Sequence, residues 1–219
     1  MSRAASPAPA VILGAGGHAR VVASILMATG RYLFKGFLDR TAETAGEDLG
    51  EGKVLGSWDD RLAEFGQDRD ACAFLAFGDG GERAAMAQRC RKAGLVLPAL
   101  VHPTACIDPT ARIGEGSVVC AQAFLGPQAQ VGEGVLVNTA ASIDHESRIG
   151  DYATLSPRVT IAGRTRIGAR TFIGIGACVA DRLTVGENAR IGAGAVVLND
   201  VPGGAFVVGI PATAKASAT

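Results

Sequence analysis

The 219-residue sequence has few aromatic residues, only 5%, and no excess of either charge, because 21 Lys and Arg balance 21 Asp and Glu. A balanced charge gives no indication of binding to nucleic acid or to a membrane surface. Long hydrophobic runs are also lacking: residues 21–27 are too few to span a bilayer, and the first ten residues have no apolar signal-peptide core. We therefore expect a cytoplasmic protein.

Cysteine and histidine are both scarce. The five cysteines form no CxxC pair and are odd in number, so at least one is unpaired, which favours a reducing compartment. The three histidines are His18, His102 and His145. Any chemistry that needs histidine has to be built from these three.

Glycine, in contrast, is abundant, with 30 residues, and a six-residue period explains it. Every sixth residue from Val101 to Val197 is Val, Ile or Leu, at seventeen positions in succession and without an insertion. The residue that follows is mostly small or Asp or Asn, as at Gly114, Asp144 and Gly168. A fixed period of this length reflects repeated structure.

A six-residue period fits neither an α-helix nor plain strand alternation. It predicts a parallel β-helix, in which each hexapeptide is a short strand and a turn, three hexapeptides form one coil, and the aliphatic side chains fill a prism-shaped core. We expect glycines at corners where a side chain would clash or φ must be positive. After Val197 the period stops, and the prolines and glycines that follow predict an extended tail.

Residues 9–98 alternate between strand and helix patterns. Strands are predicted at 10–14, 33–39 and 71–80, and helices at 17–30 and 82–94, while residues 53–66 are expected to form a short strand followed by a helix. These elements form a small parallel sheet with helices over it, about one half of a dinucleotide-binding fold.

The stretch VILGAGGHARVV, residues 11–22, places Gly14, Gly16 and Ala19 in the spacing of a dinucleotide-binding turn, and Asp39 follows where a ribose-binding carboxylate would lie. A dehydrogenase usually has both halves of this fold, so we expect no NAD. We expect one nucleoside diphosphate, held by backbone N–H groups at the helix N-terminus. A second glycine turn, at Gly78, falls at the same sheet edge; ordinary turns are the alternative interpretation.

His145 is the candidate for catalysis. It falls at a prism corner, where a side chain points outward, between Asp144 and Glu146, and Asn138 occupies a corner one repeat earlier. A carboxylate beside an imidazole fixes its tautomer and raises its basicity, which suits a general base near neutral pH. The alternative is a solvated surface histidine.

A zinc site of the carbonic-anhydrase kind, known on this scaffold, needs three histidines. Only His102 and His145 lie in the repeat, and no cysteine cluster supplies a replacement. We therefore expect no metal.

Five features together resemble the NeuD/PglD family of sugar O- and N-acetyltransferases: GAGGHARVV, the strand end at Asp39, NTAASIDHE, the unbroken hexapeptides and the closing GIPAT. The resemblance covers nearly the whole chain from Val11, and perosamine N-acetyltransferases, which use a GDP-linked sugar, are of the same kind. It implies an α/β half-Rossmann-like domain that binds a nucleotide sugar (1–98), a left-handed parallel β-helix that carries acyl transfer (99–202), and a C-terminal tail or cap (203–219).

The resemblance also implies roles for single residues. His145 would take a proton from the attacking amine, Glu146 would raise its basicity, and the backbone N–H of Gly163 would stabilise the oxyanion. The positions that match the nucleotide-sugar site are Gly16, Gly17, His18, Asp39, Arg40, Gly78 and Asn138. Those that match the acetyl-CoA site are Thr154, Ile175 and Ala193. Thr154 is a departure, because it replaces a second histidine found near the cofactor in the family.

The implied assembly is a homotrimer with acetyl-CoA bound between neighbouring prisms. The expected reaction is direct acetyl transfer from acetyl-CoA to the amine of a UDP- or GDP-linked 4-amino-4,6-dideoxy sugar, such as GDP-perosamine, in O-antigen or other glycan biosynthesis. Two alternatives stay open: O-acetylation of a sugar such as sialic acid, and a prism that binds a sugar nucleotide without turnover. The sequence identifies neither the base of the nucleotide nor the sugar that it carries.

Overall fold

The computed structural model describes residues 7–68 and 70–215. Residues 1–6 and 69 of the expected first domain, and 216–219 of the expected tail, lie outside the described residues. The N-terminal part is a parallel sheet in the order β3-β2-β1-β4. Its strands are β1 (Ala8–Leu13), β2 (Tyr32–Asp39), β3 (Val54–Ser57) and β4 (Cys72–Leu75), and its helices are α1 (Gly17–Thr29), α2 (Trp58–Phe65) and α3 (Gly80–Lys92). The predicted half-Rossmann domain is confirmed.

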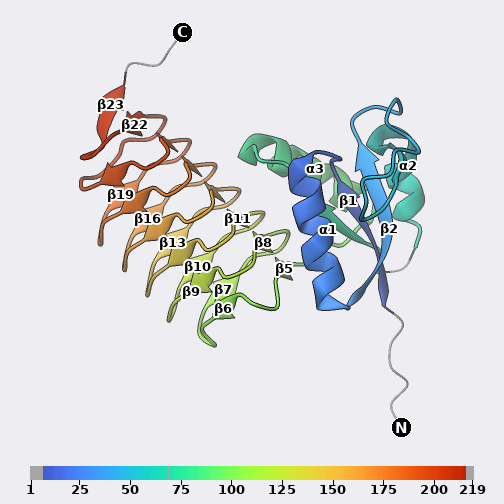
Figure 1. Ribbon diagram of the computed structural model, residues 1–219, viewed down its shortest axis with the longest axis horizontal. Coiled ribbons are helices and arrows are strands. Elements are labelled where there is room, and N and C mark those ends of the chain that lie inside the picture. The colour runs from blue at the N-terminus through green and yellow to red at the C-terminus, as the bar shows by residue number, and fades with distance from the viewer. Residues whose placement is uncertain (1–6, 69, 216–219) are drawn as a thin grey trace.

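Helices cover both faces of this sheet. On one face, α1 buries Val22 and Ile25 in a cluster that also holds Leu100, Val118 and Leu136 of the prism. The other face is covered by α2 and α3, which form a second cluster with β1 and β4. The α/β domain therefore packs against the first coils of the prism, next to β5 and β8 (Figure 1).

The prism is a left-handed parallel β-helix, as predicted. Each of its first five coils contributes one two-residue strand to each of three sheets, and the sixth coil contributes β20 and β21 to two of them. Sheet 1 holds β5 (Leu100–Val101), β8 (Val118–Val119), β11 (Leu136–Val137), β14 (Thr154–Leu155), β17 (Phe172–Ile173) and β20 (Arg190–Ile191). Sheet 2 holds β6 (Cys106–Ile107), β9 (Phe124–Leu125), β12 (Ser142–Ile143), β15 (Thr160–Ile161), β18 (Cys178–Val179) and β21 (Val196–Val197). Sheet 3 holds β7 (Arg112–Ile113), β10 (Gln130–Val131), β13 (Arg148–Ile149), β16 (Arg166–Ile167) and β19 (Thr184–Val185).

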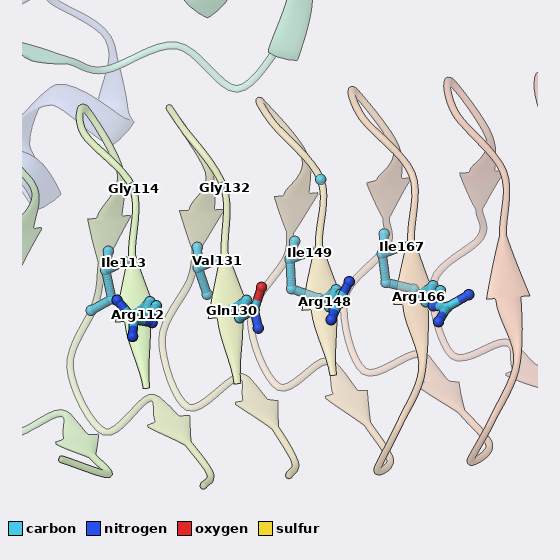
Figure 2. Close-up of a pocket in the computed structure, with 11 residues that line it drawn as sticks. Arg112, Ile113, Gly114, Gln130, Val131, Gly132, Arg148, Ile149, Arg166 and Ile167 are labelled. Atoms are coloured by element: carbon cyan, nitrogen blue, oxygen red, sulfur yellow. The ribbon is translucent and has the colours of Figure 1, made fainter. Parts of the chain in front are cut away.

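The second residue of each strand is the periodic aliphatic one, and from Val119 to Val197 these side chains are at most 4% exposed. The first residue of each strand points outward and gives each sheet its own surface. On sheet 3 the outward residues are mostly long and polar, and Figure 2 shows Arg112, Gln130, Arg148 and Arg166 projecting from successive coils. On sheet 2 none is charged: Cys106, Phe124, Ser142, Thr160, Cys178 and Val196.

The corners bear out the expectation for the glycines. Where a glycine follows the aliphatic residue it is needed for space: a Cβ on Gly114 would lie 2.4 Å from the carbonyl oxygen of Gly132 in the next coil. Positive φ occurs two residues later and falls mostly on residues with side chains, such as Glu146 (φ 59°) and Arg164 (φ 58°). The glycines that directly follow an aliphatic residue therefore allow neighbouring coils to approach closely.

The C-terminal segment also differs from the expected extended tail. β22 (Phe206–Val208) pairs in parallel with β20 and so continues sheet 1, and β23 (Thr213–Lys215) folds back antiparallel on β22. These strands cover the far end of the sheet (Figure 1). Among the described helices, none is long and apolar enough to cross a membrane.

Candidate active site

His145 lies at the corner between β12 of sheet 2 and β13 of sheet 3. Its Nδ1 is 3.3 Å from Oε2 of Glu146, and Oδ1 of Asp144 accepts its backbone N–H at 2.7 Å. Arg164, one coil further on, donates from Nε to the same oxygen of Glu146. The Arg164 hydrogen bond, followed by that of His145, holds the pKa of Glu146 below its usual value. The ionised carboxylate favours the tautomer with the proton on Nδ1, which leaves Nε2 free to accept a proton.

Gly163 lies next to this imidazole. A Cβ on Gly163 would be 2.5 Å from Nε2 and 2.6 Å from Cε1 of His145, so only glycine leaves room for the ring in this position. Among the described residues, no hydrogen-bond acceptor is found for the backbone N–H of Gly163. The structure thus brings together the three residues predicted for catalysis.

The predicted nucleotide turn connects β1 to α1. Gly14, with φ 108°, donates its N–H to the carbonyl of Leu38 at 2.7 Å. Gly16 is the N-cap of α1 and has no side chain to cap the helix, and the Cα positions of Gly16 and Gly17 face open space. The first N–H groups of the 13-residue helix α1 are therefore left for an anion.

His18 follows in the first turn of α1 and is half-buried. Burial, and secondarily the positive charge of Arg83, lower its pKa to about 4. His18 is therefore neutral at physiological pH and can both donate and accept a hydrogen bond.

Asp39 and Arg40 lie at the end of β2, on the same sheet edge. Oδ2 of Asp39 accepts from the hydroxyl of Thr44 at 3.2 Å, and the Arg40 guanidinium is 3.0 Å from the carboxylate of Glu82. Beside them a cavity of about 150 Å³ is lined by Trp58, Phe77 and Met86 together with this ion pair. The rings of Trp58 and Phe77 pack edge to face, 5.7 Å apart. Sequence reasoning missed this aromatic cavity, for which the single Trp was the available signal.

Gly78 and Thr154 meet where the α/β domain contacts the prism. The Thr154 hydroxyl donates to the carbonyl of Gly78 at 3.0 Å and accepts from Nη2 of Arg83 at 2.8 Å. Both residues line a crevice of about 260 Å³ that continues along sheet 1 past Phe172 and Arg190. Thr154 itself is only 4% exposed.

Ile175 and Ala193 stack on the corner between sheets 1 and 2, in successive coils. The carbonyl of Ile175 accepts the N–H of Gly194 at 2.8 Å, and the Ile175 side chain is 55% exposed. Asn138 lies on this same corner two coils before Ile175, and its Oδ1 accepts the N–H of Thr139 at 2.7 Å. A continuous track of corner residues therefore runs along this edge of the prism.

The candidate residues thus fall into three places. The His145 group lies on the corner between sheets 2 and 3, and Ile175, Ala193 and Asn138 lie on the corner between sheets 1 and 2. The other nucleotide candidates lie at the sheet edge of the α/β domain. No hydrogen bond or ion pair of the described residues joins His145 to either of the other groups. In the described part of the chain, no three His, Cys, Asp or Glu side chains converge as metal ligands would.

Arg83 is a second feature that the sequence did not reveal. It is 2% exposed and joins the Gly78 loop to the prism through its guanidinium. Arginine is rarely buried, and because α3 contains three arginines, the sequence does not single out Arg83 as the buried one.

Comparison with known proteins agrees with this architecture. The family described as PglD N-terminal domain matches residues 10–90, and the bacterial transferase hexapeptide (six repeats) matches residues 164–199. No curated protein matches the sequence.

Three solved structures are similar over nearly their full length. The acetyltransferase domain of PglB from Neisseria gonorrhoeae is 35% identical, with 94% of this chain and 99% of that chain covered and a TM-score of 0.87. PerB from Caulobacter crescentus, in complex with CoA and GDP-perosamine, is 33% identical, with 96% and 99% covered and a TM-score of 0.88. WeeI from Acinetobacter baumannii is 26% identical, with 94% and 99% covered and a TM-score of 0.86. The protein therefore belongs to the family of sugar acetyltransferases that join a PglD-type N-terminal domain to a hexapeptide-repeat prism.

Proposed function

We propose that the protein transfers the acetyl group of acetyl-CoA to the amine of a nucleotide-linked 4-amino-4,6-dideoxy sugar, with His145 as general base. The observation that carries this proposal is the pair of His145 and Glu146 at a prism corner, with Nε2 against the open backbone of Gly163. A prism without catalytic activity would not need an imidazole that is paired with a carboxylate and packed against a glycine.

The chemistry follows from this geometry. The amine nitrogen attacks the thioester carbonyl carbon, and Nε2 of His145 accepts the proton that the nitrogen loses. The N–H of Gly163 is a donor for the oxyanion of the tetrahedral intermediate. The C–S bond then breaks, and the CoA thiolate takes the proton from the imidazolium. Glu146 stabilises that imidazolium, so no covalent enzyme intermediate is needed.

The α/β domain supplies the site for the nucleotide. The free N–H groups at Gly16 and Gly17 suit a diphosphate, and Asp39 suits the ribose hydroxyls. In parallel sheets of this order ligands bind beyond the carboxyl ends of the strands, which is where the aromatic cavity of Trp58 and Phe77 opens. We assign the nucleotide base to that cavity, and we assign binding of the sugar to His18 and Asn138.

Acetyl-CoA is assigned to the corner track of Ile175 and Ala193, with Thr154 near its thioester end. The similar PerB structure holds both CoA and GDP-perosamine, which supports two substrates bound at once. This part of the site lies on a different prism corner from His145. A second copy of the chain must therefore supply the base.

A homotrimer satisfies this requirement. The outward side chains of sheet 2 carry no charge, whereas arginines line sheet 3. An uncharged face flanked by the two site-bearing corners suits packing about a three-fold axis, which would bring the His145 corner of one copy to the Ile175 corner of the next.

Thiol release from acetyl-CoA tests the function. The panel holds UDP- and GDP-linked 4-amino-4,6-dideoxy sugars, with free sialic acid as O-acetyl control, and each is assayed with the wild type and with His145→Asn. We expect turnover with one nucleotide sugar and a loss of about 10²-fold to 10⁴-fold in His145→Asn. Turnover with sialic acid alone, or undiminished turnover by the variant, contradicts the proposal.

A further inference from the structure

We propose that Arg83 is a positioning residue that holds the nucleotide-sugar loop, residues 77–81, in register with the prism coil on which acetyl-CoA lies. This inference rests on the proposed function. Arg83 touches neither substrate; it fixes the distance between the two parts of the chain that bind them.

The guanidinium of Arg83 makes hydrogen bonds to three separate segments. Nε donates to the carbonyl of Gly134 at 2.8 Å, and Nη1 donates to the carbonyls of Phe77 and Gly78, both at 2.9 Å. Nη2 donates to the carbonyl of Tyr152 at 2.7 Å, to that of Ala153 at 3.0 Å and to Oγ1 of Thr154 at 2.8 Å. The five N–H donors of arginine in their fixed fork are all used, and a lysine has only three.

Two further contacts anchor the same loop at the same coil. The Thr154 hydroxyl donates to the carbonyl of Gly78, and Gly80 at the start of α3 lies so close to the prism that a Cβ there would be 2.3 Å from the carbonyl oxygen of Tyr152. The loop is thus held at Phe77, Gly78 and Gly80. A loop held at three successive points has little freedom to shift along the prism.

The charge of Arg83 is also unusual. No carboxylate pairs with it among the described residues, and all of its acceptors are carbonyl or hydroxyl oxygens. Burial lowers its pKa to about 10, so the group stays cationic at neutral pH. A buried cation costs stability unless its hydrogen bonds are satisfied, and an apolar side chain could have filled the same space. Its position under loop 77–81, which it binds through the carbonyls of Phe77 and Gly78, suits a role in positioning that loop.

Arg91 provides a matched control. It also extends from α3 to the prism, where its Nη2 lies 2.6 Å from Oε1 of Glu133, but its side chain is 38% exposed. Among the described residues, no hydrogen bond or ion pair joins it to loop 77–81. Loss of Arg91 therefore weakens domain contact without releasing the loop.

The experiment compares Arg83→Met, Arg83→Lys, Thr154→Val and Arg91→Gln with the full-length wild type. It measures kcat, the KM of each substrate, and amide hydrogen exchange of residues 77–81. A 1 Å misplacement of bound substrates costs about 100-fold in rate, so we expect kcat to fall about 100-fold in Arg83→Met and about 10-fold in Arg83→Lys and Thr154→Val. The KM of acetyl-CoA should stay within about threefold in the two Arg83 variants, and loop exchange should accelerate in all three variants but not in Arg91→Gln.

Faster loop exchange with unchanged kcat in Arg83→Lys and Thr154→Val would make Arg83 a purely structural residue and overturn the inference. Unchanged exchange would overturn it as well. If Arg83→Met does not fold, the lysine and valine variants decide. Failure of the wild type to turn over any nucleotide sugar would instead refute the proposed function. The positioning role of Arg83, which rests on that function, would be refuted with it.

Discussion

The imidazole of His145 lies against the backbone of Gly163 in the next coil, with 2.5 Å between Nε2 and the position that a Cβ of Gly163 would occupy. The two residues are 18 positions apart, which is one coil, so the repeat itself brings them together. The glycine thereby sets both the place of the base and the free space in front of it.

We expect Gly163→Ala to reduce kcat by about 100-fold, because the added methyl group displaces the imidazole from the attacking amine. Gly163 does not have positive φ, so the variant should fold with an unfolding temperature close to that of the wild type. Steady-state kinetics and thermal unfolding check this. Asp181→Ala, at the same corner one coil further, is the control and should keep its activity within about twofold. Equal activity of Gly163→Ala and Asp181→Ala would contradict the assignment.

The acid limb of the pH–rate profile tests Glu146 and Arg164 together. Arg164 and His145 hold the pKa of Glu146 below its usual value, so this carboxylate is charged throughout the assay range. Glu146→Gln removes a negative charge beside the imidazolium, which should move the acid limb to lower pH and reduce kcat about 10-fold. Arg164→Met removes a positive charge and should move the limb to higher pH. Shifts in the same direction for both variants would rule out electrostatic tuning of the base.

His18 predicts a pH dependence of stability. Its pKa is about 4 in the folded protein against an ordinary value of 6.5, so the unfolded chain binds the proton more tightly. The free energy of unfolding should therefore decrease as pH falls from about 6.5 toward 4. Urea unfolding at pH 7 and pH 5 should show a smaller decrease in His18→Gln than in the wild type. His102→Gln, which changes a half-buried imidazole that accepts the backbone N–H of Thr104, should retain the full decrease. An identical decrease in all three proteins would contradict the shift.

Much of the fold could be predicted from sequence because the β-helix obeys a local rule. Each periodic aliphatic residue packs on its counterpart 18 residues later, so a period in the sequence is a stack in space, as for Ile143, Ile161 and Val179. The same rule places His145 over Gly163. After Val197 the period ends, and the pairing of β22 with β20 depends on tertiary contacts that leave no pattern in the sequence.

The domain junction could not be predicted for a similar reason. Arg83 is separated from its acceptors in the prism by 51 to 71 residues, and five of its six acceptors are main-chain carbonyls, which carry no sequence identity. The contact of Thr154 with the loop could not be predicted for the same reason. Its hydroxyl donates to the carbonyl of Gly78, but its place in the strand does not differ from the same place in other coils. Close approach of backbones, not residue type, determines these contacts.

The last prediction concerns the proposed assembly through sheet 2. Thr160 on sheet 2 and Thr184 on sheet 3 are both exposed and occupy the same outward position of their strands. Thr160→Arg would place a charge on the uncharged face, where burial of an unpaired cation between copies costs several kcal/mol. Sedimentation or light scattering should therefore show monomers for Thr160→Arg and the wild-type mass for Thr184→Arg.

Because His145 and the Ile175 track lie on different corners of one prism, dissociation should also abolish turnover. Binding of the nucleoside diphosphate to a single α/β domain should survive, and isothermal titration measures it directly. Monomeric Thr160→Arg with full activity would place both halves of the site in one chain. A trimer that persists in Thr160→Arg but dissociates in Thr184→Arg would move the interface from sheet 2 to the arginine-lined face of sheet 3.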